Sequence, residues 1–372
     1  MADKQADNYG FSKTHTQIAK GIAILLMVYH HLFVLPERLN NNYISVINMI
    51  GFDLQSYIAT FAKICVCIFV FCSGIGLYYS FIKMDSLKKM YKKALMQAIK
   101  FMSNFWIILL FLFPIGLCIG YFQCNIQTVI RLVLANYAGI GEWWFVKLYI
   151  CLVLVAPLLV RLFQKIDVKK KIIPFVVAFS ILVLSKVLAR FISPDLGILY
   201  KIIHRFTEIL DFKCVLVFIV AMLCARFNVI SIYLKISGWK KWMVCLGSVV
   251  LAIAIRVVFS NSPASMKVDF VVVPLFILPL VTLIEGTNLV AILQFLAKHS
   301  TNIWLTHTFW CYYFGQKIVL LPRYSVFIYL WLLLLAVLSS YVINLLYIPF
   351  CNLVFGKDHK LSLDGYLNKK TK

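Results

Sequence analysis

Long apolar runs separated by short polar segments make up most of the 372-residue chain. Each run is long enough to cross about 30 Å of hydrocarbon as a helix. We therefore predict an all-α, polytopic integral membrane protein, a bundle of about ten transmembrane helices. The runs lie near residues 17–36, 57–81, 101–122, 143–163, 172–191, 209–227, 241–260, 268–286, 300–320 and 324–349.

The composition agrees with this pattern. Hydrophobic residues make up 62% of the chain and the mean hydropathy is +0.90, which a water-soluble globular domain of this size would not tolerate. The net charge of +23 does not indicate nucleic-acid binding, because the lysines are not gathered with aromatic residues into one basic face. They lie between the apolar runs, as expected of a protein whose partner is the lipid bilayer.

Lysine and arginine predict the orientation, because cytoplasmic loops hold the excess of positive charge. With the N-terminus inside, 24 of these residues fall on the inner side and 9 on the outer side. Both termini are therefore predicted to be cytoplasmic, with short tails at about 1–16 and 350–372. No polar linker separates a soluble domain, so residues 1–372 are expected to form a single transmembrane domain.

The first apolar run carries the strongest candidate residues: Lys20, His30 and His31. Hydrocarbon penalises ionisable side chains, so such residues in a span indicate a functional site. Eleven residues of helix come to three turns plus roughly 20°, which places Lys20 and His31 on one face roughly 16 Å apart. His30 points elsewhere, and a helix–helix hydrogen bond is its alternative role.

His307, in the ninth run, is the other deep histidine. An imidazole can exchange a proton near physiological pH and can also accept an acyl group. Two such helices facing one cavity would form a site, and a helix–helix hydrogen bond is again the alternative. Glu142, at the outer start of the fourth run, is a weaker candidate, and Trp144 beside it is expected to anchor the helix at the membrane interface.

Other stretches have two interpretations each. Ser73 and Gly74 allow either close helix approach or a kink around a ligand. The second cytoplasmic segment, with Lys92 and Lys93, could bind the phosphates of an anionic donor such as coenzyme A. It could equally act only as a determinant of membrane topology. No glycine-rich phosphate loop, paired-cysteine zinc pattern or nucleophile elbow occurs, and no metal is expected.

Several motifs occur in order along the chain: Lys20 and His31, Phe69 to Gly74, the basic stretch Lys88 to Lys93, Trp144-Phe145 followed by Pro157, and Ser300 with Trp304-Leu-Thr-His307. In this order they resemble acyltransferase family 3, the membrane-bound O-acyltransferases of bacterial surface glycans. The likeness covers nearly the whole chain. Lysine stands at position 20 where arginine is usual, and lysines replace a frequent arginine pair, so point charges would replace forked guanidinium groups at the donor phosphates.

The resemblance implies transfer of acetyl from acetyl-CoA, a donor substrate and not a bound cofactor, to a hydroxyl of a cell-surface or lipid-linked glycan at the cell membrane. His31 would act as general base or transient acyl carrier. The implied residues are His31, Glu142 and His307 for catalysis, Lys20, Lys92 and Lys93 for donor binding, and His30, Ser73, Gly74, Trp144 and Ser300 for support.

Two other functions stay open from the sequence. A transporter or exporter of glycans or lipid intermediates could use the buried charges as a proton path, although the chain shows no obvious inverted repeat. A non-enzymatic membrane module could use the histidines as structural hydrogen-bonding groups. The acceptor sugar, the acyl group and the oligomeric state are not determined by the sequence.

Overall fold

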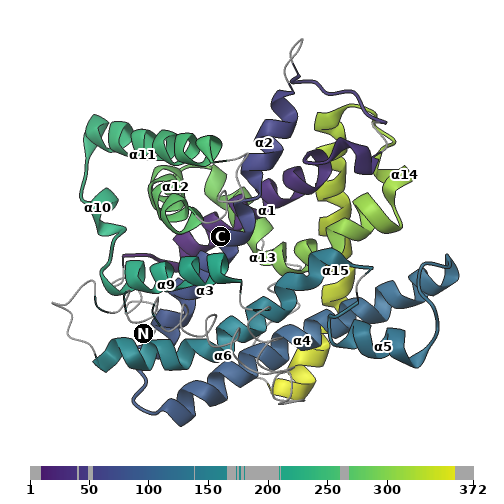
Figure 1. The fold of residues 1–372 in the computed structure, drawn as a ribbon, viewed down its shortest axis with the longest axis horizontal. Helices are drawn as coiled ribbons and strands as arrows, with labels where there is room; N and C mark the ends of the chain where they lie inside the picture. The colour runs from purple at the N-terminus through teal and green to yellow at the C-terminus, as the bar shows by residue number, and fades with distance from the viewer. Residues whose placement is uncertain are drawn as a thin grey trace. The chain divides into compact units, whose positions relative to one another are not determined.

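The structure, a computed structural model, describes residues 10–39, 42–48, 53–137, 139–165, 211–259 and 268–356, with single residues at 173, 176, 180 and 209. Within these residues the regular elements are helices (Figure 1), apart from one parallel bridge between Ile44 and Tyr324. The all-α prediction is confirmed.

Five helical segments in the described residues are long and apolar enough to span a membrane. They are Leu54–Phe81, which contains α2 (Leu54–Ala62) and α3 (Cys65–Phe81), α4 (Leu87–Cys118), Gly141–Lys165, which contains η3 (Gly141–Trp143) and α6 (Trp144–Lys165), α11 (Gly238–Val258) and α15 (Ser325–Phe355).

Three further predicted spans also coincide with helices, namely α1 (Lys13–Phe33), α9 (Phe212–Arg226) and α12 (Asp269–Ile284). The bounds predicted for the span 300–320 are wrong: α13 (Leu289–Thr308) begins eleven residues earlier, and the rest of the predicted span falls on two shorter elements, η6 (Phe309–Tyr313) and α14 (Gln316–Val319). The predicted span 172–191 lies almost wholly outside the described residues. The count of ten and the cytoplasmic termini therefore stay predictions. The other short elements are η2 (Pro36–Leu39), α5 (Ile126–Val133) and α10 (Ser231–Leu234).

The chain forms two compact units. Unit 1 consists of residues 1–30, 57–95 and 144–298, and unit 2 of residues 31–56, 96–143 and 299–372. The helices α1, α4 and α13 each begin in unit 1 and end in unit 2. Whether the two units act as the single domain expected from the sequence stays a prediction.

Unit 1 is built on α3, which packs against α6, α9 and α12, while α12 also packs against α9 and α11. Gly74 permits the close approach of α3 to α9. A Cβ atom at Gly74 would lie 2.7 Å from Cβ of Ala221 and 2.8 Å from the carbonyl oxygen of Phe218. Small residues allow such contacts between membrane helices, so helix packing accounts for glycine at this position.

A buried ion pair joins three parts of unit 1. Nε of Arg256 on α11 donates to Oδ1 of Asp269 on α12 at 3.0 Å, and Nη2 donates to Oδ2 at 3.2 Å. Nη1 donates at 3.0 Å to the carbonyl oxygen of Phe61, at the end of α2. The last carbonyls of a helix lack intrahelical partners. Arg256 therefore neutralises Asp269 and also provides a hydrogen-bond donor for a backbone carbonyl at the break between α2 and α3.

Unit 2 contains a buried network of polar side chains between α4, α13 and α15. Asn302 donates to Ser340 and to Asn344, both at 3.1 Å, and accepts from Asn104 at 2.7 Å. His299 Nδ1 lies 2.9 Å from Ser340 Oγ. Such hydrogen bonds hold membrane helices in one register. The network thereby fixes the second half of α13, which carries His307.

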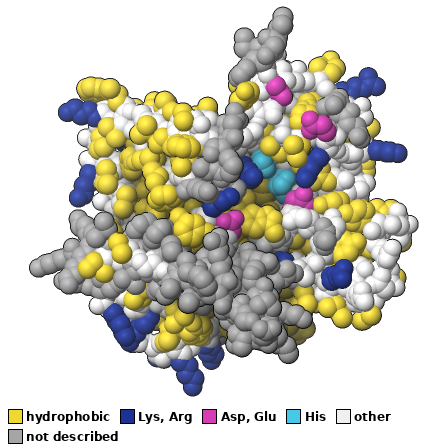
Figure 2. Space-filling model, viewed as in Figure 1, with side chains coloured by type: hydrophobic (Ala, Val, Ile, Leu, Met, Phe, Trp, Pro, Cys, Tyr) yellow, Lys and Arg dark blue, Asp and Glu magenta, His cyan; other side chains and the backbone are white. Residues whose placement is uncertain are grey.

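Hydrophobic side chains, shown in yellow in Figure 2, cover much of the described surface on the face in view. On α11, Trp242 and Val250 are more than half exposed, and on α15 Leu330 and Leu345 are as well. A soluble monomer rarely exposes apolar area on this scale. These helix faces fit contact with lipid, in agreement with an integral membrane protein.

Candidate active site in unit 2

The two neighbouring histidines at the end of α1 have different partners. His30 belongs to unit 1, where its Nδ1 lies 2.7 Å from the carbonyl oxygen of Ala59 on α2. His31 belongs to unit 2 and is half-buried. Adjacent helical residues point about 100° apart, which explains the separation. The structural alternative raised for His30 is therefore what its hydrogen bond supports.

His31 lies beside two residues that follow one another closely on α13 and η6. Its imidazole centroid is 4.9 Å from that of His307 and 5.9 Å from the ring centroid of Tyr312. The Tyr312 hydroxyl donates to the backbone carbonyl of His31 and lies 3.5 Å from its Nδ1. Two histidines predicted from separate runs are thus brought together.

The backbone of α13 determines which nitrogen of His307 carries the proton. His307 is fully buried, and its Nδ1 lies 3.0 Å from the carbonyl oxygen of Ile303 and 2.8 Å from that of Trp304. Carbonyl oxygens only accept, so Nδ1 must carry hydrogen. Nε2 is then an acceptor, and it has no hydrogen-bond partner in the described part of the chain. A buried acceptor of this kind can receive a proton donor during a reaction.

Glu142 lies in a polar pocket of about 390 Å³ that is lined by Arg38, Gly139, Gly141, Tyr312 and Tyr313 as well. Arg38 Nη1 donates to Glu142 Oε1 at 3.3 Å, and the Tyr313 hydroxyl donates to Oε2. The Arg38 guanidinium also lies over the Tyr312 ring, 4.8 Å from its centroid. Both carboxylate oxygens of Glu142 are therefore held in place.

Arg38 keeps its positive charge in this pocket. Partial burial lowers the pKa of its guanidinium, but the neighbouring Tyr312 hydroxyl and Glu142 carboxylate outweigh that effect, so the net pKa shift is upward. The pocket thus presents one cation, one carboxylate and two phenol groups, with Tyr312 linking it to His31. This set can hold a polyhydroxylated molecule by directed hydrogen bonds.

A π-helix, η6, places the two tyrosines. Its wider turn is seen where the backbone N–H of Phe314 donates to the carbonyl oxygen of Phe309 at 2.7 Å. Short π-helical turns inside helices often occur at functional sites. Arg38, Tyr312 and Tyr313 are not among the site residues predicted from the sequence. The two tyrosines had one local signal, the largely aromatic run 309–314 that follows Thr308, and Arg38 had none.

The supporting residues lie in less distinctive surroundings. Ser73 Oγ donates to the carbonyl oxygen of Phe69, one turn earlier in α3, and Gly74 packs on α9 as described. Trp144 is 40% exposed at the start of α6, whereas Ser300 is buried in α13. Of the supporting set, Ser300 alone belongs to unit 2.

The three predicted donor-binding lysines all belong to unit 1. Lys20 lies in α1, close to Cys72. Lys92 and Lys93 are exposed in the first turns of α4, and Lys93 Nζ donates to the carbonyl oxygen of Ser80 at 3.3 Å. No structural observation tests their role in donor binding, which stays a prediction. Among the described residues, no group of three His, Cys, Asp or Glu side chains could hold a metal ion.

A family model described as an acyltransferase domain matches residues 17–346. The match covers most of the chain and includes residues of both units. It confirms the resemblance found in the order of the sequence motifs. No curated protein and no solved structure matches the chain.

Proposed function

This chain belongs to acyltransferase family 3, and we propose that it transfers acetyl from acetyl-CoA to a hydroxyl group of a cell-surface or lipid-linked glycan at the cell membrane. Family membership and the apolar helices support acyl transfer by a membrane protein in general. The acetyl donor and the glycan acceptor rest on the motif resemblance and on the chemistry of the pocket.

One observation carries the proposal: a half-buried imidazole, His31, lies beside His307 and is joined to a polar pocket through Tyr312. In the proposed reaction His31 takes the proton of the acceptor hydroxyl, whose oxygen attacks the thioester carbonyl carbon. A carbon–oxygen bond forms and the carbon–sulfur bond breaks. The proton on His31 then passes to the leaving thiolate, which gives the acetyl ester and free coenzyme A.

The pocket around Glu142 supports a sugar as acceptor. Glu142 and Arg38 offer a hydrogen-bond acceptor and donors, and the two tyrosines add phenol groups with flat aromatic rings. Small-ligand sites combine such placed polar groups with aromatic walls. In this proposal Glu142 positions the sugar, and His307 accepts a hydrogen bond from His31 once His31 is protonated.

The donor is assigned to the cytoplasmic side. Coenzyme A carries phosphate groups, and lysines bind phosphate as flexible point charges. Lys20, Lys92 and Lys93 are the proposed donor-binding residues, in keeping with the inner position that the charge pattern predicts for them. His31, eleven residues further along α1, would then act nearer the outer side.

Mass spectrometry of surface glycans tests the function. Cells lacking the protein are complemented with wild type, His31→Ala or His30→Ala, and the membrane level of each variant is measured. A general base contributes about 10²–10⁴ in rate, so the acetyl mass increment is expected to disappear in the deletion and with His31→Ala. His30→Ala, the matched control on the same helix, is expected to retain it.

An acetyl pattern that is unchanged in the deletion strain would overturn glycan acetylation and favour the transporter alternative. Equal loss with His30→Ala and His31→Ala, at equal membrane levels, would overturn the assignment of the base to His31 alone.

A further inference from the structure

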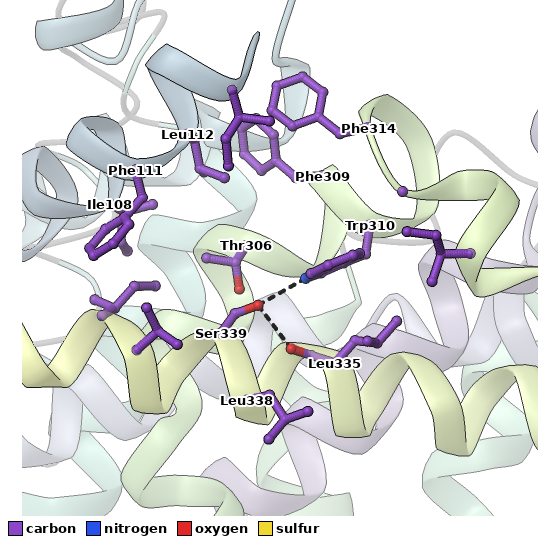
Figure 3. A pocket seen from close by; sticks show the side chains of 15 residues that line it. Ile108, Phe111, Leu112, Thr306, Phe309, Trp310, Phe314, Leu335, Leu338 and Ser339 are labelled. Carbon is purple, nitrogen blue, oxygen red and sulfur yellow. Dashed lines mark hydrogen bonds between the residues drawn. The ribbon is translucent and has the colours of Figure 1, made fainter. Parts of the chain in front are cut away.

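A second cavity lies in unit 2, of about 500 Å³ and with almost wholly apolar walls. Figure 3 shows its lining side chains, which come from α4, α13, α15 and the segment around η6. Its size is within the range of ligand sites, about 300–1,000 Å³. None of the residues proposed above for catalysis or donor binding lines it.

The few polar groups in the wall are satisfied by the protein itself. Trp310 Nε1 donates to Ser339 Oγ at 2.9 Å, and Ser339 Oγ donates to the carbonyl oxygen of Leu335 at 2.8 Å, as the dashed lines in Figure 3 show. Thr306 Oγ1 donates to the carbonyl oxygen of Asn302 at 2.7 Å. A sugar or a phosphate in this cavity would lose its hydration without gaining partners. The walls therefore suit hydrocarbon.

The apolar cavity and the polar pocket share one wall, the helix η6. Phe309 and Trp310 line the cavity, whereas Tyr312 and Tyr313 line the pocket. The rings of Phe309 and Tyr313 are in contact, with centroids 5.4 Å apart. A molecule with a polar head and a hydrocarbon chain can therefore place each part on its own side of the same short helix.

Building on the proposed function, we propose that the acceptor is a lipid-linked sugar and that its hydrocarbon chain lies in the cavity lined by Phe309, Trp310 and Leu338. The sugar then lies in the pocket with Glu142 and Arg38, next to His31. The charge and hydrogen-bonding groups of the pocket and the apolar walls of the cavity together select a glycolipid over either a free sugar or a simple lipid.

Photo-crosslinking tests this assignment with the purified full-length protein in phosphatidylcholine nanodiscs. The probe is dodecyl glucoside with a diazirine in its alkyl chain, and labelled residues are mapped by mass spectrometry. Saturable labelling is expected at cavity residues such as Phe111 and Leu335. Unlabelled dodecyl glucoside is expected to compete, and methyl glucoside to compete only weakly.

A matched pair of variants on α15 locates the site. Leu338 lines the cavity and is 50% exposed, whereas Leu345 is 53% exposed and does not line it. Leu338→Trp is expected to weaken probe binding about tenfold, the loss that follows when roughly two methylene groups of the chain are no longer buried. Leu345→Trp is expected to bind as wild type. Val342→Phe gives a second narrowing of the cavity if Leu338→Trp does not fold.

Three results would overturn the proposal. Labelling that is not saturable at the cavity would show that no chain binds there. Equal competition by dodecylphosphocholine would assign the cavity to membrane lipid in general. Stronger competition by palmitoyl-CoA than by unlabelled dodecyl glucoside would assign it to the acyl chain of the donor. These readouts need no acyl transfer, so a failure of the proposed function is seen separately, as glycans that do not change when the protein is deleted.

Discussion

The imidazole rings of His31 and His307 lie with their centroids 4.9 Å apart, although the two residues come from opposite ends of the sequence. His31 contacts Tyr312, which lines the polar pocket around Glu142. His307 is fully buried, and its Nδ1–H donates to backbone carbonyl oxygens of α13. The pair therefore combines a half-buried imidazole with a buried acceptor nitrogen of fixed tautomer.

Removing the acceptor nitrogen of His307 should slow the reaction without preventing folding. A hydrogen bond to a charged group contributes about 1.5–3 kcal/mol, which corresponds to roughly 10- to 100-fold in rate. We expect His307→Phe to lower kcat by that factor, with KM for acetyl-CoA little changed. His307→Gln, which keeps an acceptor, should retain more activity. Full turnover with His307→Phe would leave His307 a structural residue only.

Glu142 should depend on Tyr313 for its position. The Tyr313 hydroxyl donates to one carboxylate oxygen and Arg38 donates to the other. Tyr313→Phe removes one hydrogen bond to a charged group, so we expect acetyl transfer to fall about tenfold or more. Tyr324→Phe is the control, since Tyr324 is 48% exposed and does not line the pocket. Equal activity of the two variants would contradict a role for the Tyr313 hydroxyl in positioning Glu142.

The Arg256–Asp269 pair should matter for stability and not for chemistry. Its side chains are 4% and 0% exposed, and breaking a buried pair costs about 3–5 kcal/mol because one charge stays buried alone. Arg256→Met should lower the thermal unfolding temperature in detergent strongly, and Arg256→Met with Asp269→Leu should recover much of it. Arg131→Met, at an exposed site, should have little effect. A double variant as unstable as the single one would contradict this explanation.

Two glycines on α3 should respond in opposite ways to alanine. A Cβ at Gly74 would meet Ala221 and the backbone of Phe218, whereas a Cβ at Gly76 would meet nothing within 4 Å. Gly74→Ala is therefore expected to destabilise the protein by about 1–3 kcal/mol through overpacking. Gly76→Ala should be neutral or stabilising by up to about 1 kcal/mol, since alanine favours the helix. Thermal unfolding of both variants gives the comparison, and destabilisation by Gly76→Ala alone would refute it.

The predicted orientation can be tested through Cys124, which is exposed in the segment between α4 and α5. The charge pattern places residues 123–142 outside. In a variant with Cys118→Ser, a membrane-impermeant maleimide should label Cys124 in intact cells. A cysteine introduced by Lys369→Cys in the C-terminal tail should react only after the cells are opened. The reverse labelling pattern would show that the membrane orientation is opposite to the predicted one.

The sequence by itself determined the fold class and the family. Hydropathy is a local property, because each run of apolar residues long enough to cross the bilayer must form a helix whatever the rest of the chain does. The motif order, from Lys20 and His31 to Trp304-Leu-Thr-His307, was also sufficient to indicate the acyltransferase family that matches residues 17–346.

Only the tertiary structure decided which residues meet. The spacing from Lys20 favoured His31 over His30, but the separate partners of the two histidines follow from packing between distant helices. Arg38 and Tyr313 could not be singled out, because an arginine in a loop and a tyrosine in an aromatic run are ordinary in membrane proteins. The π-helix η6 is formed by backbone hydrogen bonds between residues five positions apart. A helix of only five residues leaves no periodic pattern of apolar positions in the sequence. Contacts between distant segments depend on side-chain shape and hydrogen bonding in three dimensions. Local hydropathy does not predict such contacts.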